Sequence, residues 1–219
     1  MSFVSYILNG ISLGSVYAII ALGYTMVYGI AKMLNFAHGD IIMVGSYVAF
    51  IAINSMGLPV PVSILLSVVV CTVLGMVIER VAYKPLRHAS KLAVLITAIG
   101  ASYFLQNVAL LIFGANTKSF TSIVGNGSVQ LAGGALSVTM VTIVTVIACV
   151  VIMIGLMAFM KYSKAGHAMV AVSEDDGAAQ LMGINVNATI ALTFAIGSGL
   201  AAIAGVLLCS AYPSLTPYT

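Results

Sequence analysis

Long apolar runs alternate with short polar breaks along almost the whole chain of 219 residues. Most of these runs approach or exceed the roughly 20 residues that an α-helix needs to cross a bilayer. The pattern predicts an all-α polytopic membrane protein with a single transmembrane domain over residues 1–219. About six spans are expected, over residues 4–30, 41–53, 62–78, 92–113, 138–160 and 187–210.

The composition supports a membrane protein and excludes an ordinary soluble domain. Hydrophobic residues make up 62% of the chain, charged residues only 6%, and the mean hydropathy is +1.18. A soluble domain carries about a quarter charged residues. No basic stretch precedes the first apolar run, and no small-residue cleavage site stands out. We therefore expect residues 4–30 to be a retained span and not a signal peptide.

The positions of the basic residues predict the orientation of the chain in the membrane. Four of the eight lysines and arginines lie within residues 79–91. Cytoplasmic loops of membrane proteins carry an excess of such residues, so this loop is expected to be cytoplasmic. Two predicted spans separate this loop from Lys32, and two separate it from residues 161–185, so both segments are expected on the same side. Three spans separate it from the N-terminus, which is therefore expected outside. Seven of the eight basic residues are then inside, and Lys118 alone is outside.

The segment of residues 161–185 is a polar stretch between two apolar runs. Three of the five acidic residues of the chain, Glu174, Asp175 and Asp176, lie in it. Ser173 followed three residues later by Asp176 is a capping-box pattern, which predicts that a helix begins here. Glu174 and Asp175 would complement the positive end of the helix dipole.

A short amphipathic helix is therefore predicted within this polar stretch. It would be about nine residues or 14 Å long, and Gly183 would end it in a left-handed cap. Ala178, Leu181 and Met182 fall on one face. The helix is too short to cross a bilayer and too small to fold alone. We interpret it as a docking segment for a soluble partner, and the alternative is a solvated connecting loop.

A second polar stretch, residues 32–40, separates the first two apolar runs. Asn35, His38, Gly39 and Asp40 occur close together there. Charged groups inside a membrane are costly and usually face protein or water. Helices broken by glycine and polar residues at membrane depth are typical of transporters, where they line a substrate route. The alternative is a cytoplasmic turn in which Asp40 favours the N-terminus of the second span.

The segment between the fourth and fifth spans predicts a β-hairpin. Residues 119–124 and 128–131 could form its two short strands around Gly125-Asn126-Gly127. In the first span, Gly10 and Gly14 form a small-xxx-small step, and Gly23 continues this compact face. Such faces allow helices in lipid to approach closely, so helix packing is expected along this face.

The chain lacks the motifs that would support catalysis. It contains no Gly-x-x-x-x-Gly-Lys-Ser/Thr phosphate loop, and the three histidines have no metal-ligand spacing. Cys71, Cys149 and Cys209 lie in apolar runs at unrelated spacings, which predicts buried free thiols. We expect no enzyme activity, no metal and no cofactor. The pattern instead favours a transport channel that is driven from outside the chain.

Several motifs, in this order, resemble those of the high-affinity branched-chain amino-acid ABC importer permeases. The resemblance is strongest to the first, smaller of the two permease types, and it extends over essentially the whole chain. The motifs are Asn9-Gly10, residues 14–18 (GSVYA), 34–39 (LNFAHG), 79–87 (ERVAYKPLR) and 181–185 (LMGIN).

The resemblance implies a subunit of an ATP-driven importer for leucine, isoleucine and valine in the bacterial cytoplasmic membrane. Its partners would be a second permease in a heterodimer, two ATP-binding cassette ATPases and an external substrate-binding protein. No nucleic acid is expected as a partner. With the resemblance, the substrate pathway is expected to include Asn35, Phe36, His38, Gly39 and Asp40.

The resemblance also implies that residues 161–185 are the segment that couples the permease to the ATPase. Importer permeases typically carry Glu-Ala-Ala, three residues and then Gly in this segment. Here Gly177 replaces the Glu, and Asp176 lies one position earlier. The expected coupling residues are Ser173, Glu174, Asp175, Asp176, Ala178, Ala179, Leu181 and Gly183.

Three alternatives come from other functional classes. A permease of the same superfamily for urea or short amides would share much of the Asn-x-Ala-His-Gly region. A carrier driven by an ion gradient would show ionisable residues in several spans and a second broken helix. A membrane scaffold is the third. Family members usually continue with a Gly-rich segment and further spans, so a truncated or unusually short permease is expected.

Overall fold

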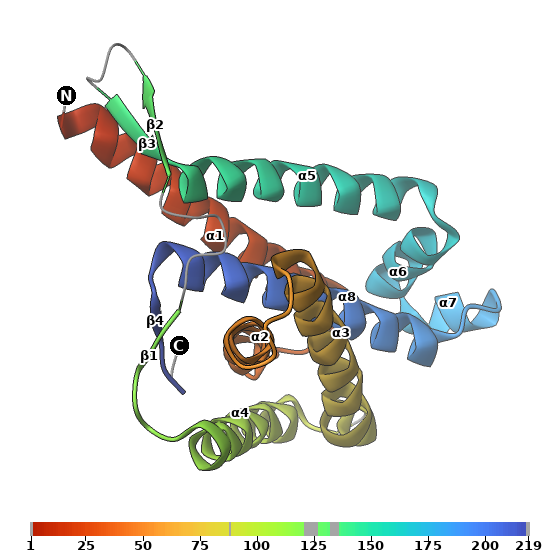
Figure 1. The fold of residues 1–219 in the computed structure, drawn as a ribbon. Coiled ribbons are helices and arrows are strands. Elements are labelled where there is room, and N and C mark those ends of the chain that lie inside the picture. The colour runs from red at the N-terminus through yellow and green to blue at the C-terminus, as the bar shows by residue number, and fades with distance from the viewer. Residues whose placement is uncertain (1, 88, 121–126, 132–135, 218–219) are drawn as a thin grey trace.

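The computed structural model describes residues 2–87, 89–120, 127–131 and 136–217 of the chain. Its architecture is a bundle of long helices (Figure 1). The long helices of these residues are α1 (Ser2–Ala31), α2 (His38–Asn54), α3 (Val60–Ile78), α4 (Lys91–Phe113), α5 (Met140–Tyr162) and α8 (Val186–Ala211). The predicted all-α class is confirmed.

The lengths of these helices fit a chain that crosses a membrane several times. Five stretches of the described residues are long and apolar enough to span, and they lie in α1, α3 with the turns that follow it, α4, α5 and α8. The helix α2 has 17 residues, or about 25 Å, which is shorter than the hydrocarbon core of about 30 Å. It begins three residues earlier than the predicted second span, because His38, Gly39 and Asp40 are helical.

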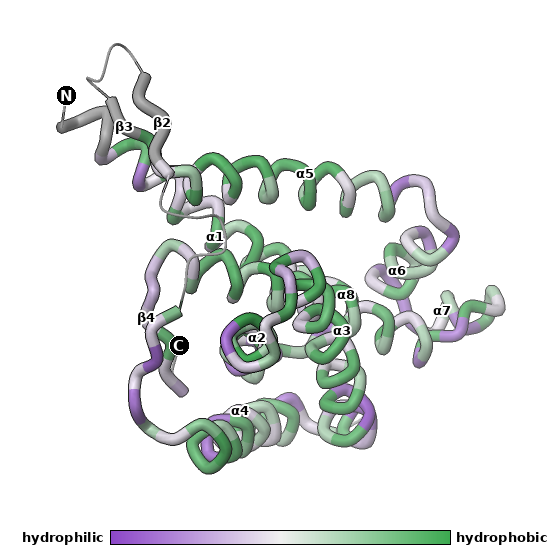
Figure 2. The backbone as a smooth tube through the Cα atoms, viewed as in Figure 1, coloured by the Kyte–Doolittle hydropathy of each residue, from purple (hydrophilic) through white to green (hydrophobic). Residues whose placement is uncertain are grey.

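The central helix of the bundle is α8. Its most apolar stretch is 78% buried within the chain, whereas that of α5 is only 11% buried. It packs against α1, α2 and α3, and all three surround it in Figure 1. Apolar residues run along α3, α4 and α5 (Figure 2), and many of their large apolar side chains are exposed. Lipid or another apolar surface is therefore needed around these helices.

Small residues set the close contacts of α8. A Cβ added to Gly75 of α3 would lie 1.9 Å from the Ser198 hydroxyl oxygen. A Cβ on Gly197 would lie 3.0 Å from the Gly23 carbonyl of α1. Such contacts bring helix backbones close together, as is common in membrane proteins.

The predicted packing face of the first span is only partly right. Gly23 lies in the contact with α8, but Gly10 and Gly14 are exposed and have no other described atoms close to where a Cβ would stand. Their part of α1 extends beyond α8 toward the N-terminus, where β2 and β3 lie in Figure 1. A small-residue step permits close packing, but it does not supply a partner.

The short strands differ from the predicted hairpin. The strand β2 (Ser128–Leu131) forms at the expected place, but it pairs with β3 (Leu136–Thr139). The strand β1 (Lys118–Ser119) pairs with β4 (Ser214–Leu215), which follows α8. The prediction that residues 119–124 pair with 128–131 is therefore wrong for Ser119, and residues 121–126 lie outside the described residues. The sequence carries a second turn signal, Gly133-Gly134, which favours the pairing found.

The polar stretches of the chain meet at one end of the bundle, which we call the polar end. Two short helices, α6 (Lys164–Glu174) and α7 (Asp176–Leu181), connect α5 to α8 there. At the same end, α3 continues into a π-helical turn η1 (Glu79–Tyr83) and a 3₁₀ turn η2 (Lys84–Leu86) before α4 begins. Figure 1 shows α6 and α7 far from β1, β4 and the N-terminus.

Candidate functional site: the polar end and the start of α2

The helix α7 begins at a different N-cap from the one predicted. Asp175 is the cap, and its Oδ1 accepts a 2.9 Å hydrogen bond from the Ala178 backbone N–H. Ser173 lies within α6 and donates its hydroxyl to the Val170 carbonyl. The predicted capping box of Ser173 with Asp176 is therefore wrong, and α7 has six residues instead of about nine. The predicted helix was too long because the polar stretch holds two helices with a break at Asp175.

The end of α7 matches the prediction. Gly183 has a φ of +84°, which places it in the left-handed region. The Gly183 N–H donates to the Gln180 carbonyl, and the Ile184 N–H donates to the Ala179 carbonyl, both at 3.0 Å. This pair of bonds is the Schellman motif, which satisfies carbonyls that a helix end would otherwise leave unpaired. It also fixes the direction in which the chain leaves α7.

The predicted coupling residues of α7 divide into an outward and an inward set. Leu181 is 91% exposed and Met182 is 83% exposed, and Ala178 is exposed as well. Ala179 is buried in the same hydrophobic cluster as Ile190 of α8. Ala179 therefore anchors α7 to the bundle, and two large apolar side chains point outward from a polar segment. These two adjacent apolar side chains are therefore free to contact an apolar surface of a partner.

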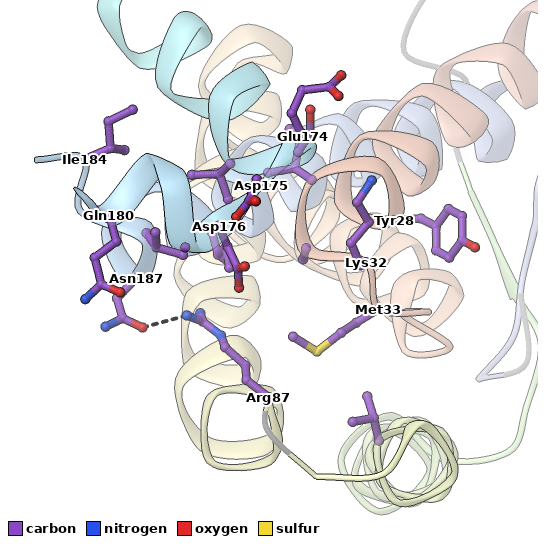
Figure 3. Close-up of a pocket in the computed structure, with 18 of the residues that line it drawn as sticks. Tyr28, Lys32, Met33, Arg87, Glu174, Asp175, Asp176, Gln180, Ile184 and Asn187 are labelled. Atoms are coloured by element: carbon purple, nitrogen blue, oxygen red, sulfur yellow. Dashed lines mark hydrogen bonds between the residues drawn. The ribbon is translucent and has the colours of Figure 1, made fainter. Parts of the chain in front are cut away.

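A cavity of about 1350 Å³ lies beside α7 (Figure 3). The end of α1 and the segment after it form one wall, and the start of α4 with Arg87 forms another. The junction of α6 and α7 and the start of α8 complete the lining. The cavity thus brings together the polar breaks that the sequence separates by more than a hundred residues.

The lining of the cavity carries both signs of charge. Its acidic residues, Glu174, Asp175 and Asp176, all come from the junction of α6 and α7. Its basic residues come from the other walls and are Lys32, Arg87 and Lys91. In Figure 3 the Asp176 carboxylate points toward the Arg87 side of the cavity, and the Glu174 carboxylate points away from it. The walls are therefore of opposite charge.

Arg87 connects two distant parts of the polar end. One guanidinium nitrogen, Nη1, donates a 2.6 Å hydrogen bond to Asn187 Oδ1 in the first turn of α8. The other, Nη2, forms an ion pair with the buried Glu79 carboxylate at the start of η1. The planar guanidinium can serve both partners at fixed geometry, which a lysine ammonium cannot do in the same way.

The predicted pathway residues lie around the start of α2, but they face different neighbours. Asn35 is buried, and its Oδ1 accepts a 3.0 Å hydrogen bond from the Tyr83 hydroxyl of η1. His38 is buried against α1, with its ring centroid 5.9 Å from that of Tyr24. Asp40 is buried toward α4 and accepts a hydrogen bond from Gln106.

The start of α2 is thus tied to three neighbours and is not gathered into one site. Phe36 is 45% exposed, and Gly39 is exposed with open space above it. Within the described residues, neither ring nitrogen of His38 has a hydrogen-bond partner, and the same holds for Asp40 Oδ2. Buried polar atoms are nearly always paired, so these atoms are available to a ligand or to water.

Sequence reasoning did not single out Tyr83 or Gln106. Arg87 was noted only as one of several basic residues in a loop. Tyr83 and Arg87 lie within the ERVAYKPLR motif, which therefore carried a usable signal. Gln106 offered one too, because an amide side chain in the middle of an apolar span needs a partner. The last span was predicted to begin at Asn187, but Asn185 is the N-cap of α8, and its Oδ1 accepts from the Ala188 N–H.

The described geometry can now be compared with known proteins. Residues 6–218 match the family model described as the permease component of a branched-chain amino acid transport system. The chain belongs to this permease family. Family members are permease components, so the match assigns this chain to the membrane part of a transport system. No solved structure matches the chain.

Curated relatives in the family cover nearly the whole chain. The high-affinity branched-chain amino acid transport system permease protein LivH of Salmonella typhimurium is 42% identical over 99% of this chain and 73% of its own length. The corresponding protein BraD of Pseudomonas aeruginosa is 44% identical over 98% of this chain and 73% of its own length. A probable LivH permease of Methanocaldococcus jannaschii is 30% identical over 87% of this chain. These names do not favour the urea or amide permease alternative.

Proposed function

We propose that this chain is a permease subunit of an ATP-driven importer that carries leucine, isoleucine and valine across the bacterial cytoplasmic membrane. The proposal is supported by membership of the family and by identities of 42–44% to permeases that are named for branched-chain amino acid transport. The free energy would come from two partner ATPases, and a substrate-binding protein would deliver the amino acid from outside. A second, related permease would complete the membrane channel.

The orientation follows from charge. Lys32, Arg80, Lys84, Arg87, Lys91, Lys161 and Lys164 all belong to the polar end or the segments that reach it, whereas Lys118 lies in β1 near the opposite end. The positive-inside rule then makes the polar end cytoplasmic. The coupling segment and the cavity would face the ATPases, and β1 and β4 would face the binding protein.

The helix α7 would be the coupling helix, and the single observation that carries this proposal is the exposure of Leu181 and Met182. A helix that is capped at both ends and anchored by Ala179 presents these two side chains to the cytoplasm at a fixed position. An apolar socket on an ATPase would bury them, at a gain of roughly 1.5–3 kcal/mol for each side chain that is fully buried. ATP-driven closure of the ATPases would then move α7 and the start of α8.

The start of α2 would contribute to the route of the substrate. A hydrophobic amino acid needs polar groups for its charged ends and apolar walls for its side chain. The unpaired oxygen of Asp40 is suited to an ammonium group, because it is a buried acceptor without a donor. His38 lies on the α1 side of the same helix turn, so both residues cannot line a single narrow path. We therefore assign the contact with the substrate ammonium group to Asp40 and not to His38.

Co-purification with the ATPases of the same importer tests the coupling helix. A variant with Leu181→Asp and Met182→Asp should lose the ATPases, because two charges would have to enter the apolar socket. Val170→Asp is the matched control, since Val170 is an exposed apolar residue of the neighbouring helix α6. Equal retention of the ATPases by the double variant and the wild type would contradict docking through α7.

Uptake measurements test the substrate. Proteoliposomes that contain the complete importer should accumulate leucine only with ATP and the binding protein, and excess urea should not compete. Competition by urea without competition by isoleucine would favour the amide permease instead.

A further inference from the structure

We infer that Arg87 is a positioning residue that links the coupling helix α7 to the irregular segment before α2. The inference rests on the proposed function, in which α7 moves with the ATPases. It concerns how that motion reaches the start of α2, and it is argued from a continuous set of hydrogen bonds and packed side chains at the polar end.

The first step leads from α7 to α8. Only residues 182–185 separate the two helices, and Gly183 and Asn185 fix this connection through the end cap of one helix and the N-cap of the next. Ala179 of α7 and Ile190 of α8 are buried in one cluster. The first turn of α8 must therefore follow α7 when α7 is displaced.

The second step leads from α8 to η1. Asn187 lies in the first turn of α8 and accepts the 2.6 Å hydrogen bond from Arg87 Nη1. Arg87 Nη2 is ion-paired with Glu79, which begins η1. Charge-assisted bonds to a planar fork are short and directional. A displacement of Asn187 is thus transmitted to η1, although the two residues joined by the first bond are 100 positions apart.

The third step leads from η1 to the start of α2. Glu79 and Tyr83 are the first and last residues of the π-helical turn, and both are buried. The Tyr83 hydroxyl donates to Asn35 Oδ1, three residues before α2 begins. The Tyr83 ring also packs against Phe194 of α8 at a centroid distance of 5.2 Å. π-helical turns inside longer helices are frequent at functional sites.

A purely structural role for Arg87 would be limited to neutralising the buried Glu79 charge. Under that role the bond to Asn187 would be dispensable, because Asn187 is exposed and the ion pair remains without it. Spatial continuity alone does not demonstrate coupling, so the test has to measure the ratio of transport to ATP hydrolysis.

The experiment uses the complete importer in proteoliposomes and compares Asn187→Ala with the wild type. We expect ATPase retention and basal hydrolysis to stay within twofold, while the leucine transported per ATP falls at least fivefold, which is the lower end of measured coupling effects. Asn107→Ala is the matched control, because Asn107 is exposed and, among the described residues, its side chain bonds to the Tyr103 carbonyl of its own helix. An unchanged ratio for Asn187→Ala would overturn the inference.

A second pair of variants tests whether the steps form one link. Tyr83→Phe keeps the ring and removes the hydroxyl that donates to Asn35 Oδ1 and, at 3.4 Å, to the neighbouring Leu34 carbonyl, so it should also lower the transport per ATP. Combined with Asn187→Ala, it should cause little more loss than the larger single effect. A loss equal to the product of both single losses would mean independent effects and would overturn the link.

The binding protein provides a readout that does not depend on the transported amino acid. Loaded binding protein should stimulate ATP hydrolysis less in Asn187→Ala than in the wild type. If the wild type transports no leucine, the proposal about the substrate is wrong. The ratio of stimulated to basal ATP hydrolysis still tests the link through Arg87, because it can be measured without transport. An unreduced stimulation in Asn187→Ala would count against the link alone.

Discussion

Gln106 of α4 donates a 3.0 Å hydrogen bond to the buried Asp40 carboxylate of α2. The apolar stretch of α4 is only 17% buried within the chain, so this polar contact is one of few that hold α4 in place. Gln106→Leu would remove this donor from the buried carboxylate. We expect a destabilisation of at least about 1–3 kcal/mol, measured by thermal unfolding in detergent.

Two further variants give this prediction a control. Asn107→Leu changes the neighbouring residue, which is exposed and donates to the Tyr103 carbonyl of its own helix, so it should be close to neutral. Gln106→Leu combined with Asp40→Leu removes both partners and should recover much of the lost stability. If Asn107→Leu and Gln106→Leu unfold at the same temperature, the hydrogen bond to Asp40 contributes nothing measurable.

The contact between α3 and α8 depends on the absence of a side chain at Gly75. Gly75→Ala would place a methyl group against Ser198, and overpacking of this kind costs typically about 1–3 kcal/mol. Gly100 of α4 has open space among the described residues, and Ala is favoured there over Gly by roughly 1 kcal/mol of helix propensity. Gly75→Ala should therefore lower the unfolding temperature, and Gly100→Ala should not. Equal unfolding temperatures would contradict the close approach.

The left-handed cap at Gly183 predicts a defect in coupling and not in folding. Gly183→Ala introduces a left-handed strain of about 1–2 kcal/mol at a site that is otherwise open. We expect α7 to lose its fixed direction, so that fewer ATPases are retained on co-purification. Gly183→Asn should retain more ATPase than Gly183→Ala, since asparagine tolerates this conformation better. The reverse order would show that the cap is unimportant.

The ion pair of Glu79 and Arg87 predicts an asymmetric response to mutation. Arg87→Met leaves the Glu79 charge buried and unpaired, which typically costs about 3–5 kcal/mol. The pair of changes Glu79→Leu and Arg87→Met removes both charges and should be much less destabilising. Chemical denaturation of the three forms in mixed micelles measures this difference. If the double variant is the least stable of the three forms, the ion pair stabilises the fold by more than the neutralisation of the Glu79 charge.

The helices could be predicted from the sequence because their signal is local. Each long apolar run is bounded by polar or glycine-rich residues, and the structure places helices close to all of the predicted ranges. The N-cap of α7 was missed because Ser173 and Asp175 are both good caps. The choice between them depends on the burial of Met169 and Val172, which extends α6 past Ser173.

The candidate site was less accessible to sequence reasoning because its contacts join distant residues. The residues of the break before α2 were found as a group, but their separation onto different neighbours follows from the positions of α1, η1 and α4. No local pattern relates Arg87 to Asn187 or Asp40 to Gln106. Such pairs are specified only when the whole bundle has assembled.

The pairing of β1 with β4 fixes one end of α4, about which the rest of the helix could rotate. This strand pair joins the segment after α4 to the chain that follows α8, and the stacked rings of Tyr47 and Phe113, 4.1 Å apart, hold the same end of α4 to α2. The 23 residues of α4 extend about 34 Å from that end to Lys91. A rotation of about 10° about the fixed end would move the Lys91 end by roughly 6 Å, which is about one helical turn. Because Lys91 lines the cavity, such a rotation would change the width of the cavity at the other end of α4.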